Sequence, residues 1–192
     1  MQKIILASQS PRRKQLLEWA NIPFEIIVHE TDESYPADLA IEQVPVYIAR
    51  QKALAVKEGL PINVRHQRPV LAADTVVILN NVIIGKPINR EHAIEILQSL
   101  SGNHHQVITG VVILYGDEEN AFHETTDVSF HPLTIDQVTY YVDHYKPYDK
   151  AGAYAIQEWI GVVGIKHIHG DFYNVMGLPV SRVVHALNQF HV

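Results

Sequence analysis

The sequence contains no cysteine, and this absence excludes several kinds of site. Without thiols there is no disulfide framework, no thiolate metal site and no cysteine nucleophile, and nothing points to an oxidising compartment. Long apolar runs are also missing: none approaches the ~20 residues that a membrane helix needs, and residues 4–7 are too few for a signal-peptide core. We therefore expect a soluble, cytoplasmic protein with no membrane partner.

Positive charge is scarce, with 15 Lys and Arg against 21 Asp and Glu and a formal net charge of -6. Sequence-independent binding to DNA or RNA relies on many Lys and Arg contacts to phosphates, so no nucleic-acid partner is expected. A few local cations can still hold one small polyphosphate. With 47% hydrophobic and 19% charged residues in 192, the composition is that of a folded chain, and residues 1–192 are predicted to form a single domain.

Hydrophobic periodicity predicts strands that alternate with helices. The chain is expected to form an α/β fold, with a mixed, twisted sheet flanked by helices and a ligand cleft at the sheet. Asn80-Asn81 is typical of a tight hairpin turn, and Pro45 is expected to break or kink a helix that becomes regular near Val46. Strands are predicted over residues 3–8, 24–28, 69–79, 82–84, 105–115, 124–131 and 161–168, and helices over 11–20, 46–58, 93–100, 135–145 and 180–187.

Asp74 lies inside the most apolar run of the chain, VLAADTVVIL at residues 70–79. Burying an ionised carboxylate without partners is costly, so this side chain is expected to face a metal, a cation or a cleft. The alternative is a bulge or strand end in which Asp74 and Thr75 bond to the backbone.

Residues 8–13, Ser-Gln-Ser-Pro-Arg-Arg, follow a predicted strand and open a predicted helix. The hydroxyls, the backbone N–H groups and the guanidinium groups of Arg12 and Arg13 can converge there on an anion, which suits phosphate. The segment lacks the glycine spacing of a Walker loop, and a capped helix with two solvated arginines is an equal alternative.

Two lysines and one segment rich in small residues are further candidates. Lys52 shares a helical face with apolar residues, so its ammonium group points towards that face unless it bends out to solvent. Lys86 stands between Gly85 and Pro87, which is also a common loop sequence. Residues 149–157 would let a ligand approach the backbone closely, or would form a tight surface loop.

The 12 histidines suggest a metal site, in particular His104-His105 and the pair His167 and His169 on one strand face. They do not show zinc-helix spacing such as His-Glu-x-x-His. Scattered, solvated histidines are the simpler interpretation, and none is assigned to the site.

Taken together, these segments resemble the Maf family of septum formation inhibitor-like nucleotide pyrophosphatases. The likeness runs from Ile4 to the last helix, and the motifs agree in order and spacing. It implies a Maf/ITPase-like α/β fold with two lobes around a central cleft, in a homodimer. It also implies cleavage between the α- and β-phosphates with a divalent metal cation, Mg2+ or Mn2+. The matching segments are residues 8–13, 32–33, 49–53, 73–75, 85–87, 100–102, 149–157 and 177–179.

The resemblance also implies roles for individual residues. Asp74 would be the proton acceptor that activates water, and Glu33 and Asp74 would hold the metal. Metal ions and cations neutralise charge that develops on phosphoryl oxygens, and a carboxylate orients or deprotonates the attacking water. Phosphate contacts are assigned to Ser8, Arg13, Lys52 and Lys86, and the two lysines belong to the catalytic set.

The branch of the family selective for dTTP and UTP carries Arg, Thr and Gln at three positions, which are Arg12, Thr75 and Gln157 here. The Gln amide offers a donor and an acceptor, which suits the N3–H and a carbonyl of uracil or thymine. The implied partner is a pyrimidine nucleoside triphosphate, in nucleotide-pool house-cleaning. The family more often has Gly at the positions of Ala155 and Glu158, which leaves the flexibility of this loop and the substrate range open.

The family name also suggests a different class of function, a nucleotide-binding regulator of septum formation that acts through a protein partner. The two hypotheses differ in whether the Asp74 carboxylate is required for function. An enzyme needs its carboxylate, whereas an effect on division that survives Asp74→Asn would favour the regulator. Modified pyrimidine nucleotides are an open alternative to dTTP and UTP.

Overall fold

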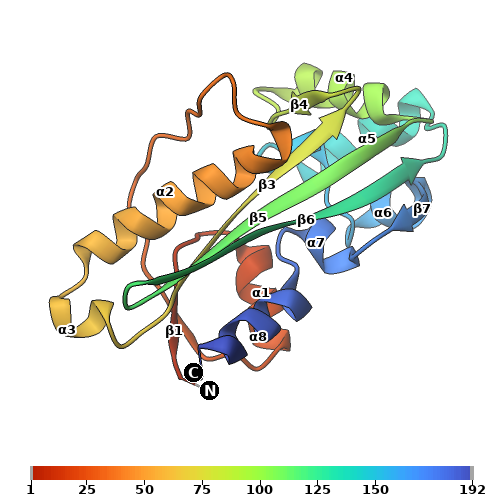
Figure 1. Ribbon diagram of the computed structural model, residues 1–192. Helices are drawn as coiled ribbons and strands as arrows, with labels where there is room; N and C mark the ends of the chain where they lie inside the picture. The colour runs from red at the N-terminus through yellow and green to blue at the C-terminus, as the bar shows by residue number, and fades with distance from the viewer. Residues whose placement is uncertain (1, 191–192) are drawn as a thin grey trace. The chain divides into compact units, whose positions relative to one another are not determined.

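A mixed sheet of seven strands, flanked by helices, organises the chain in the computed structural model, which describes residues 2–190 (Figure 1). The strand order is β2-β1-β3-β5-β6-β7, and β4 pairs with β3. β1 is parallel to β2 and β3, whereas β4 is antiparallel to β3 and β7 to β6, as the predicted mixed sheet requires. The strands are β1 Ile4–Leu6, β2 Phe24–Ile26, β3 Val70–Leu79, β4 Val82–Ile84, β5 His104–Tyr115, β6 Glu118–Phe130 and β7 Ile165–His169.

Three of the described helices begin with a capping side chain. Ser10, Asn89 and Thr134 each accept a backbone N–H at the start of a helix, and Thr134 forms a capping box with Gln137. Among residues 2–190, no helix is long and apolar enough to cross a membrane. The helices are α1 Pro11–Trp19, α2 Val44–Gly59, α3 Ile62–Arg65, α4 Arg90–Leu100, α5 Ile135–Tyr145, α6 Trp159–Gly164, α7 Phe172–Met176 and α8 Val180–Gln189, with 3-10 turns η1 Ile41–Gln43 and η2 Ala151–Ala153.

The chain divides into two compact units whose segments are interleaved. The first unit holds the chain up to Asp74, Thr109–Glu124 and the chain from Gly177. The second holds Thr75–Ile108 and Thr125–Met176. The divisions fall inside β3, β5 and β6, so each of these strands contributes residues to both units.

The core of the first unit forms between α2 and the strands beside it. Ala49 and Ala53 of α2 are fully buried with Val70 and Val112 of β3 and β5. The helix expected to become regular near Val46 begins at Val44, directly after the 3-10 turn η1. Pro45 lies in its first turn without a kink, because a missing N–H costs no helical hydrogen bond there.

The start of α2 approaches β5 very closely at Gly110. A Cβ atom on Gly110 would lie 2.2 Å from the Val46 nitrogen and 2.3 Å from the Pro45 carbonyl carbon. Only glycine allows this approach of two backbones.

The hairpin and the helix predicted for residues 69–102 both form, and the turn, β4 and α4 lie in the second unit. Asn80 and Asn81 have φ values of 51° and 64°, as the turn between two closely paired strands requires, and Leu79 pairs with Val82. The four apolar residues at helical spacing in α4 are all buried: Ala93, Ile96, Leu97 and Leu100.

Two predicted boundaries are wrong. β6 begins at Glu118 instead of the predicted residue 124, and only the two-residue turn Gly116-Asp117 separates it from β5. The strand predicted from residue 161 begins at Ile165, because α6 occupies the preceding residues.

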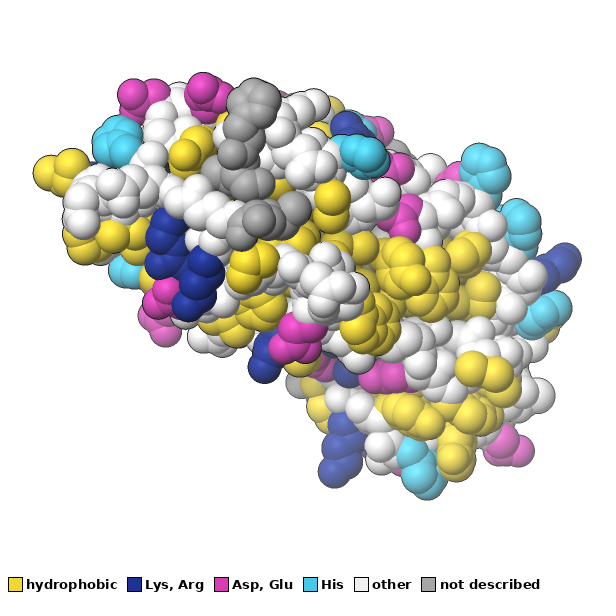
Figure 2. All heavy atoms as spheres, turned by 90° about the horizontal axis from the view of Figure 1, so that it is seen from below, with side chains coloured by type: hydrophobic (Ala, Val, Ile, Leu, Met, Phe, Trp, Pro, Cys, Tyr) yellow, Lys and Arg dark blue, Asp and Glu magenta, His cyan; other side chains and the backbone are white. Residues whose placement is uncertain are grey.

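Side chains of different kinds are mixed on one face of the protein. On the face shown in Figure 2, Lys and Arg occupy small separate groups among acidic, hydrophobic and neutral side chains. That face therefore carries no continuous basic surface, in keeping with the net charge of -6.

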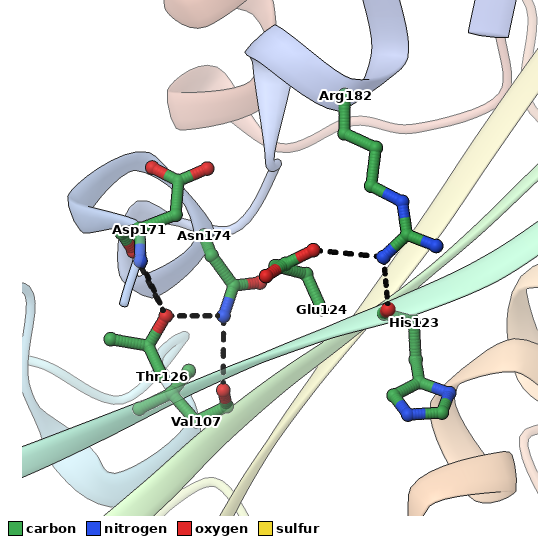
Figure 3. Close-up of polar contacts among 7 residues, drawn as sticks. All are labelled: Val107, His123, Glu124, Thr126, Asp171, Asn174 and Arg182. Atoms are coloured by element: carbon green, nitrogen blue, oxygen red, sulfur yellow. Dashed lines mark hydrogen bonds and ion pairs between the residues drawn. The ribbon is translucent and has the colours of Figure 1, made fainter. Parts of the chain in front are cut away.

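Two polar anchors hold the C-terminal helices to the strands of their own units (Figure 3). In the second unit the buried Asn174 of α7 donates through Nδ2 to the Val107 carbonyl and to Thr126 Oγ1, both at 3.0 Å. In the first unit Arg182 of α8 donates to the His123 carbonyl and to Glu124 Oε2, both at 2.8 Å. These bonds satisfy polar groups where helix meets sheet.

Candidate active site

The candidate residues fall in both units. Six lie in the first unit, namely Ser8, Arg12, Arg13, Glu33, Lys52 and Asp74. Three lie in the second unit, namely Thr75, Lys86 and Gln157. The boundary falls on the peptide bond between Asp74 and Thr75, inside β3.

Lys52 brings two candidate carboxylates of the first unit together. Its Nζ lies 2.7 Å from Glu33 Oε1 and 2.7 Å from Asp74 Oδ1. The side chains of Lys52 and Asp74 are only 19% and 16% exposed, so the lysine does not bend out to solvent. The apolar run around Asp74 predicted a metal, a cation or a cleft, and the structure supplies a cation from α2.

Ser8 and Arg13 form a second hydrogen-bonded cluster in the first unit. Ser8 Oγ accepts from the Ser10 N–H and from Arg13 Nη1, both at 3.2 Å. Arg13 Nε donates to the Gly177 carbonyl at 2.8 Å, so the segment before α8 holds this guanidinium group. Arg12 and Arg13 are both half-buried, so the alternative of a capped helix with two solvated arginines is wrong in its second part.

Arg13 of this cluster also interacts electrostatically with the carboxylates that Lys52 contacts. Burial lowers the pKa of the Arg13 guanidinium, and Arg12 lowers it further, whereas the carboxylates of Asp74 and Glu33 raise it. Arg13 is therefore within electrostatic reach of both carboxylates that Lys52 contacts. Arginine stays protonated in proteins. Two cations, Arg13 and Lys52, therefore act on the carboxylates of Asp74 and Glu33.

This donor set fits a magnesium-like ion. Among residues 2–190 no three His, Asp or Glu side chains group as ligands for a metal. Glu33 and Asp74 nevertheless converge within hydrogen-bond distance of one atom, Lys52 Nζ. Mg2+ is usually held by one or two carboxylates together with substrate phosphates and water, so two carboxylates are sufficient.

The second unit brings the segment of Lys86 to the loop that carries Gln157. The Gly152 N–H donates to the Gly85 carbonyl at 3.2 Å. Lys86 and Gln157 are exposed, whereas Thr75 is half-buried in β3. The small size of Gly152 serves packing, because a Cβ atom there would lie 2.9 Å from Val77 Cγ2.

Comparison with protein families gives a match to the family described as Maf-like protein over residues 3–190. The chain belongs to the Maf family. Its Maf relatives include the dTTP/UTP pyrophosphatase of Cytophaga hutchinsonii, 50% identical over 97% of this chain and 83% of that protein. The proteins of the same name from Bacteroides fragilis and Bacillus anthracis are 45% and 47% identical, over 97% and 100% of this chain and 95% and 97% of theirs. Among solved structures, the Staphylococcus aureus Ham1 protein aligns with a TM-score of 0.46 and 16% identity over 67% of this chain and 72% of that chain.

One histidine of this Maf chain departs from the expectation of solvated histidines. His105 is 3% exposed and packs edge-on against the Phe130 and Tyr154 rings. Its Nε2 lies 2.7 Å from Tyr154 Oη. Burial, with a smaller effect of His104, lowers the pKa of His105 to about 4. The neutral ring therefore belongs to the core of the second unit.

A polar network beside Gln157 was not predicted from the sequence. Tyr141, Lys150 and Glu158 lie close together in the second unit of this Maf chain. The signal available in the sequence was Glu158, which follows Gln157 directly and stands where the family more often has Gly. The contacts of Glu158 with Tyr141 and Lys150 depend on how α5 packs against this loop. The spacing of residues in the sequence does not predict them.

Proposed function

We propose that this chain hydrolyses dTTP and UTP to the monophosphate and pyrophosphate, as a cytoplasmic enzyme of nucleotide-pool house-cleaning. Its Maf relatives at 45% to 50% identity carry the name dTTP/UTP pyrophosphatase. The observation that carries the proposal is the position of Lys52 Nζ, 2.7 Å from both Glu33 and Asp74. Such a cluster suits the charge of a polyphosphate and the activation of water.

The proposed reaction uses the residues of the first unit. Asp74 accepts a proton from water as the water oxygen bonds to the α-phosphorus. The bond from that phosphorus to the bridging oxygen breaks, and pyrophosphate leaves with the electron pair. Ser8, Arg13 and Lys52 bind phosphate oxygens, and Lys52 also orients the Asp74 carboxylate.

A divalent cation is the proposed cofactor. Glu33 and Asp74 would hold Mg2+ or Mn2+, which would supply positive charge against the charge that develops on the phosphoryl oxygens. Lys86 of the second unit is proposed as a further phosphate contact, since its ammonium group is exposed beside Gly85.

Base selection is assigned to Arg12, Thr75 and Gln157. The Gln157 amide is exposed and offers one donor and one acceptor face, which matches the N3–H and a carbonyl of uracil and thymine. A homodimer and the absence of a nucleic-acid partner stay predictions.

A substrate panel with purified protein tests the proposal. Each triphosphate is incubated with Mg2+ or Mn2+, and pyrophosphate and orthophosphate are measured separately. Pyrophosphate from dTTP and UTP, with little from purine nucleotides, is expected. Orthophosphate alone, or no turnover of any nucleotide, would reject the proposal and favour a binding protein.

Substitution of the proposed base gives the matching mechanistic test. Asp74→Asn keeps the shape of the side chain but cannot take up the proton, and we expect kcat to fall by about 10²- to 10⁴-fold. The matched control is Asp136→Asn, an exposed carboxylate in the first turn of α5, which should leave kcat unchanged. Full turnover by the Asp74→Asn protein would refute the role of this carboxylate.

A further inference from the structure

The carboxylate of Glu158 is held from two sides inside the second unit. Its Oε2 accepts a hydrogen bond from Tyr141 Oη, and its Oε1 lies 3.7 Å from Lys150 Nζ. The lysine side chain is only 10% exposed and also contacts Asp149 Oδ1 at 2.8 Å. We call Glu158, Tyr141 and Lys150 the Glu158 clamp.

The clamp closes a loop whose backbone is strained. Gly152 and Ala153 have φ values of 68° and 57°, and the left-handed conformation is unfavourable for alanine. Ala153 is completely buried, and such a conformation persists only where the surroundings enforce it. Tyr141 Oη supplies part of that enforcement, because it also accepts the Ala155 N–H at 3.1 Å.

Gln157 lies within the part of the loop that the clamp fixes. The Glu158 N–H donates to the Ala155 carbonyl at 3.1 Å, which closes a turn over residues 155–158 with Gln157 in its third position. Ile156 on one side is buried, and Glu158 on the other is clamped. The backbone of Gln157 is thus held on both sides while its side chain faces solvent.

The backbone also has no room to relax beyond the turn. A Cβ atom on Gly161 would lie 1.7 Å from the Ile156 carbonyl oxygen, so α6 packs directly against the turn. Its first turn is closed by the Gly161 N–H, which donates to the Glu158 carbonyl at 2.9 Å. Glu158 therefore couples the direction of the turn to Tyr141 of α5 through its side chain and to α6 through its backbone.

We propose that the Glu158 clamp positions the Gln157 amide for base recognition, which makes Glu158 and Tyr141 specificity-determining positioning residues. The inference rests on the proposed function and extends it to residues that would not touch the nucleotide. A side chain that reads a base by one donor and one acceptor discriminates only while its direction is fixed, because a mobile amide also accommodates the wrong base.

The test compares Glu158→Ala, Glu158→Gln and the control Glu95→Ala, an exposed glutamate of α4 in the same unit. For Glu158→Ala we expect KM for UTP and dTTP to rise about tenfold, kcat to stay within about twofold, and the preference for UTP over CTP to fall about tenfold. Glu158→Gln keeps an acceptor for the Tyr141 hydroxyl and should retain most of the preference. The affinities of UMP and CMP, measured by calorimetry, give a readout independent of turnover.

A double-mutant cycle separates positioning from general stability. If the clamp acts through Gln157, Glu158→Ala should have no further effect on base preference in a Gln157→Ala protein. A loss in that background equal to the loss in the wild type would overturn the inference, as would equal losses in kcat for all substrates. If Glu158→Ala does not fold, Tyr141→Phe removes a single oxygen atom from the clamp and carries the same expectations.

The failure of the proposed function would look different from the failure of the clamp. A wild-type protein that neither cleaves nor binds uridine nucleotides would remove the proposed function and this inference with it. A wild-type protein that cleaves UTP, with a Glu158→Ala variant as selective as Glu95→Ala, would leave the function intact and refute the clamp alone.

Discussion

Replacing Lys52 by Met would remove the cation that Glu33 and Asp74 share. Methionine has a similar length and helix propensity, so the change tests charge more than shape. Removing one partner of a buried ion pair costs about 3–5 kcal/mol, whereas an exposed pair contributes about 0–1 kcal/mol. Lys52 and Asp74 are 19% and 16% exposed, which lies between these cases, and we expect a loss of about 2 kcal/mol.

Thermal unfolding in EDTA measures this loss. For a chain of this size, a change of about 2 kcal/mol shifts Tm by about 4–8 °C. The matched control is Lys14→Met, because Lys14 pairs with Glu18 at 3.7 Å with both side chains about half exposed. An exposed helical pair of this kind contributes about 0.3–0.5 kcal/mol, so Tm of the control should fall by no more than about 2 °C.

Added Mg2+ should then stabilise the Lys52→Met protein more than the wild type. In the wild type the ammonium group lies 2.7 Å from the same two carboxylates that are proposed to hold the ion, and it competes for them. A variant that is as stable as Lys14→Met in EDTA would refute the energetic reasoning. An equal Mg2+ effect in variant and wild type would refute the shared site.

Two further predictions concern the core of each unit. Unfolded His105 binds a proton near pH 6.5 and the folded form only near pH 4, so wild-type stability should fall as pH drops through this window, by about 2 kcal/mol at pH 5. His105→Gln keeps a hydrogen-bond partner for Tyr154 but cannot take up a proton, so the difference in unfolding free energy between pH 7.5 and pH 5, measured in urea, should shrink by this amount. An unchanged difference would contradict the lowered pKa of His105. Gly110→Ala should cost about 3 kcal/mol or more in urea unfolding, since its Cβ would meet backbone at 2.2 Å, whereas Gly85→Ala, with nothing within 4 Å, should cost far less. Equal losses for the two glycines would show that α2 can move away from β5.

Local pattern was enough where neighbouring residues decide the structure. The buried face of α4 follows from apolar spacing, and the β3–β4 turn follows from Asn80-Asn81, because both depend on contacts within a few positions. A carboxylate inside an apolar strand likewise indicated that Asp74 faces a metal, a cation or a cleft, and the structure supplies the cation Lys52.

Other features depend on contacts between distant parts of the chain. Residues 159–164 contain β-branched side chains, which are typical of a strand, but they form α6. In α6, Gly161 packs directly against the Ile156 carbonyl, a contact that the local sequence does not reveal. His105 is buried because Phe130 and Tyr154 surround it, which no local spacing reveals. Glu33 pairs with Lys52 from the segment between β2 and η1. Its place in the site was predicted from the family resemblance and not from the pattern of residues.

The interleaving of the two units has a consequence for synthesis on the ribosome. Every candidate residue, from Ser8 to Gln157, has been made before the chain reaches Gly177, which supplies the carbonyl that Arg13 contacts. The Arg182 anchor of α8 to β6 is made later still. A nascent chain thus carries a full set of candidate side chains while its first unit is incomplete, and the proposed phosphate site should mature only after the last helix emerges.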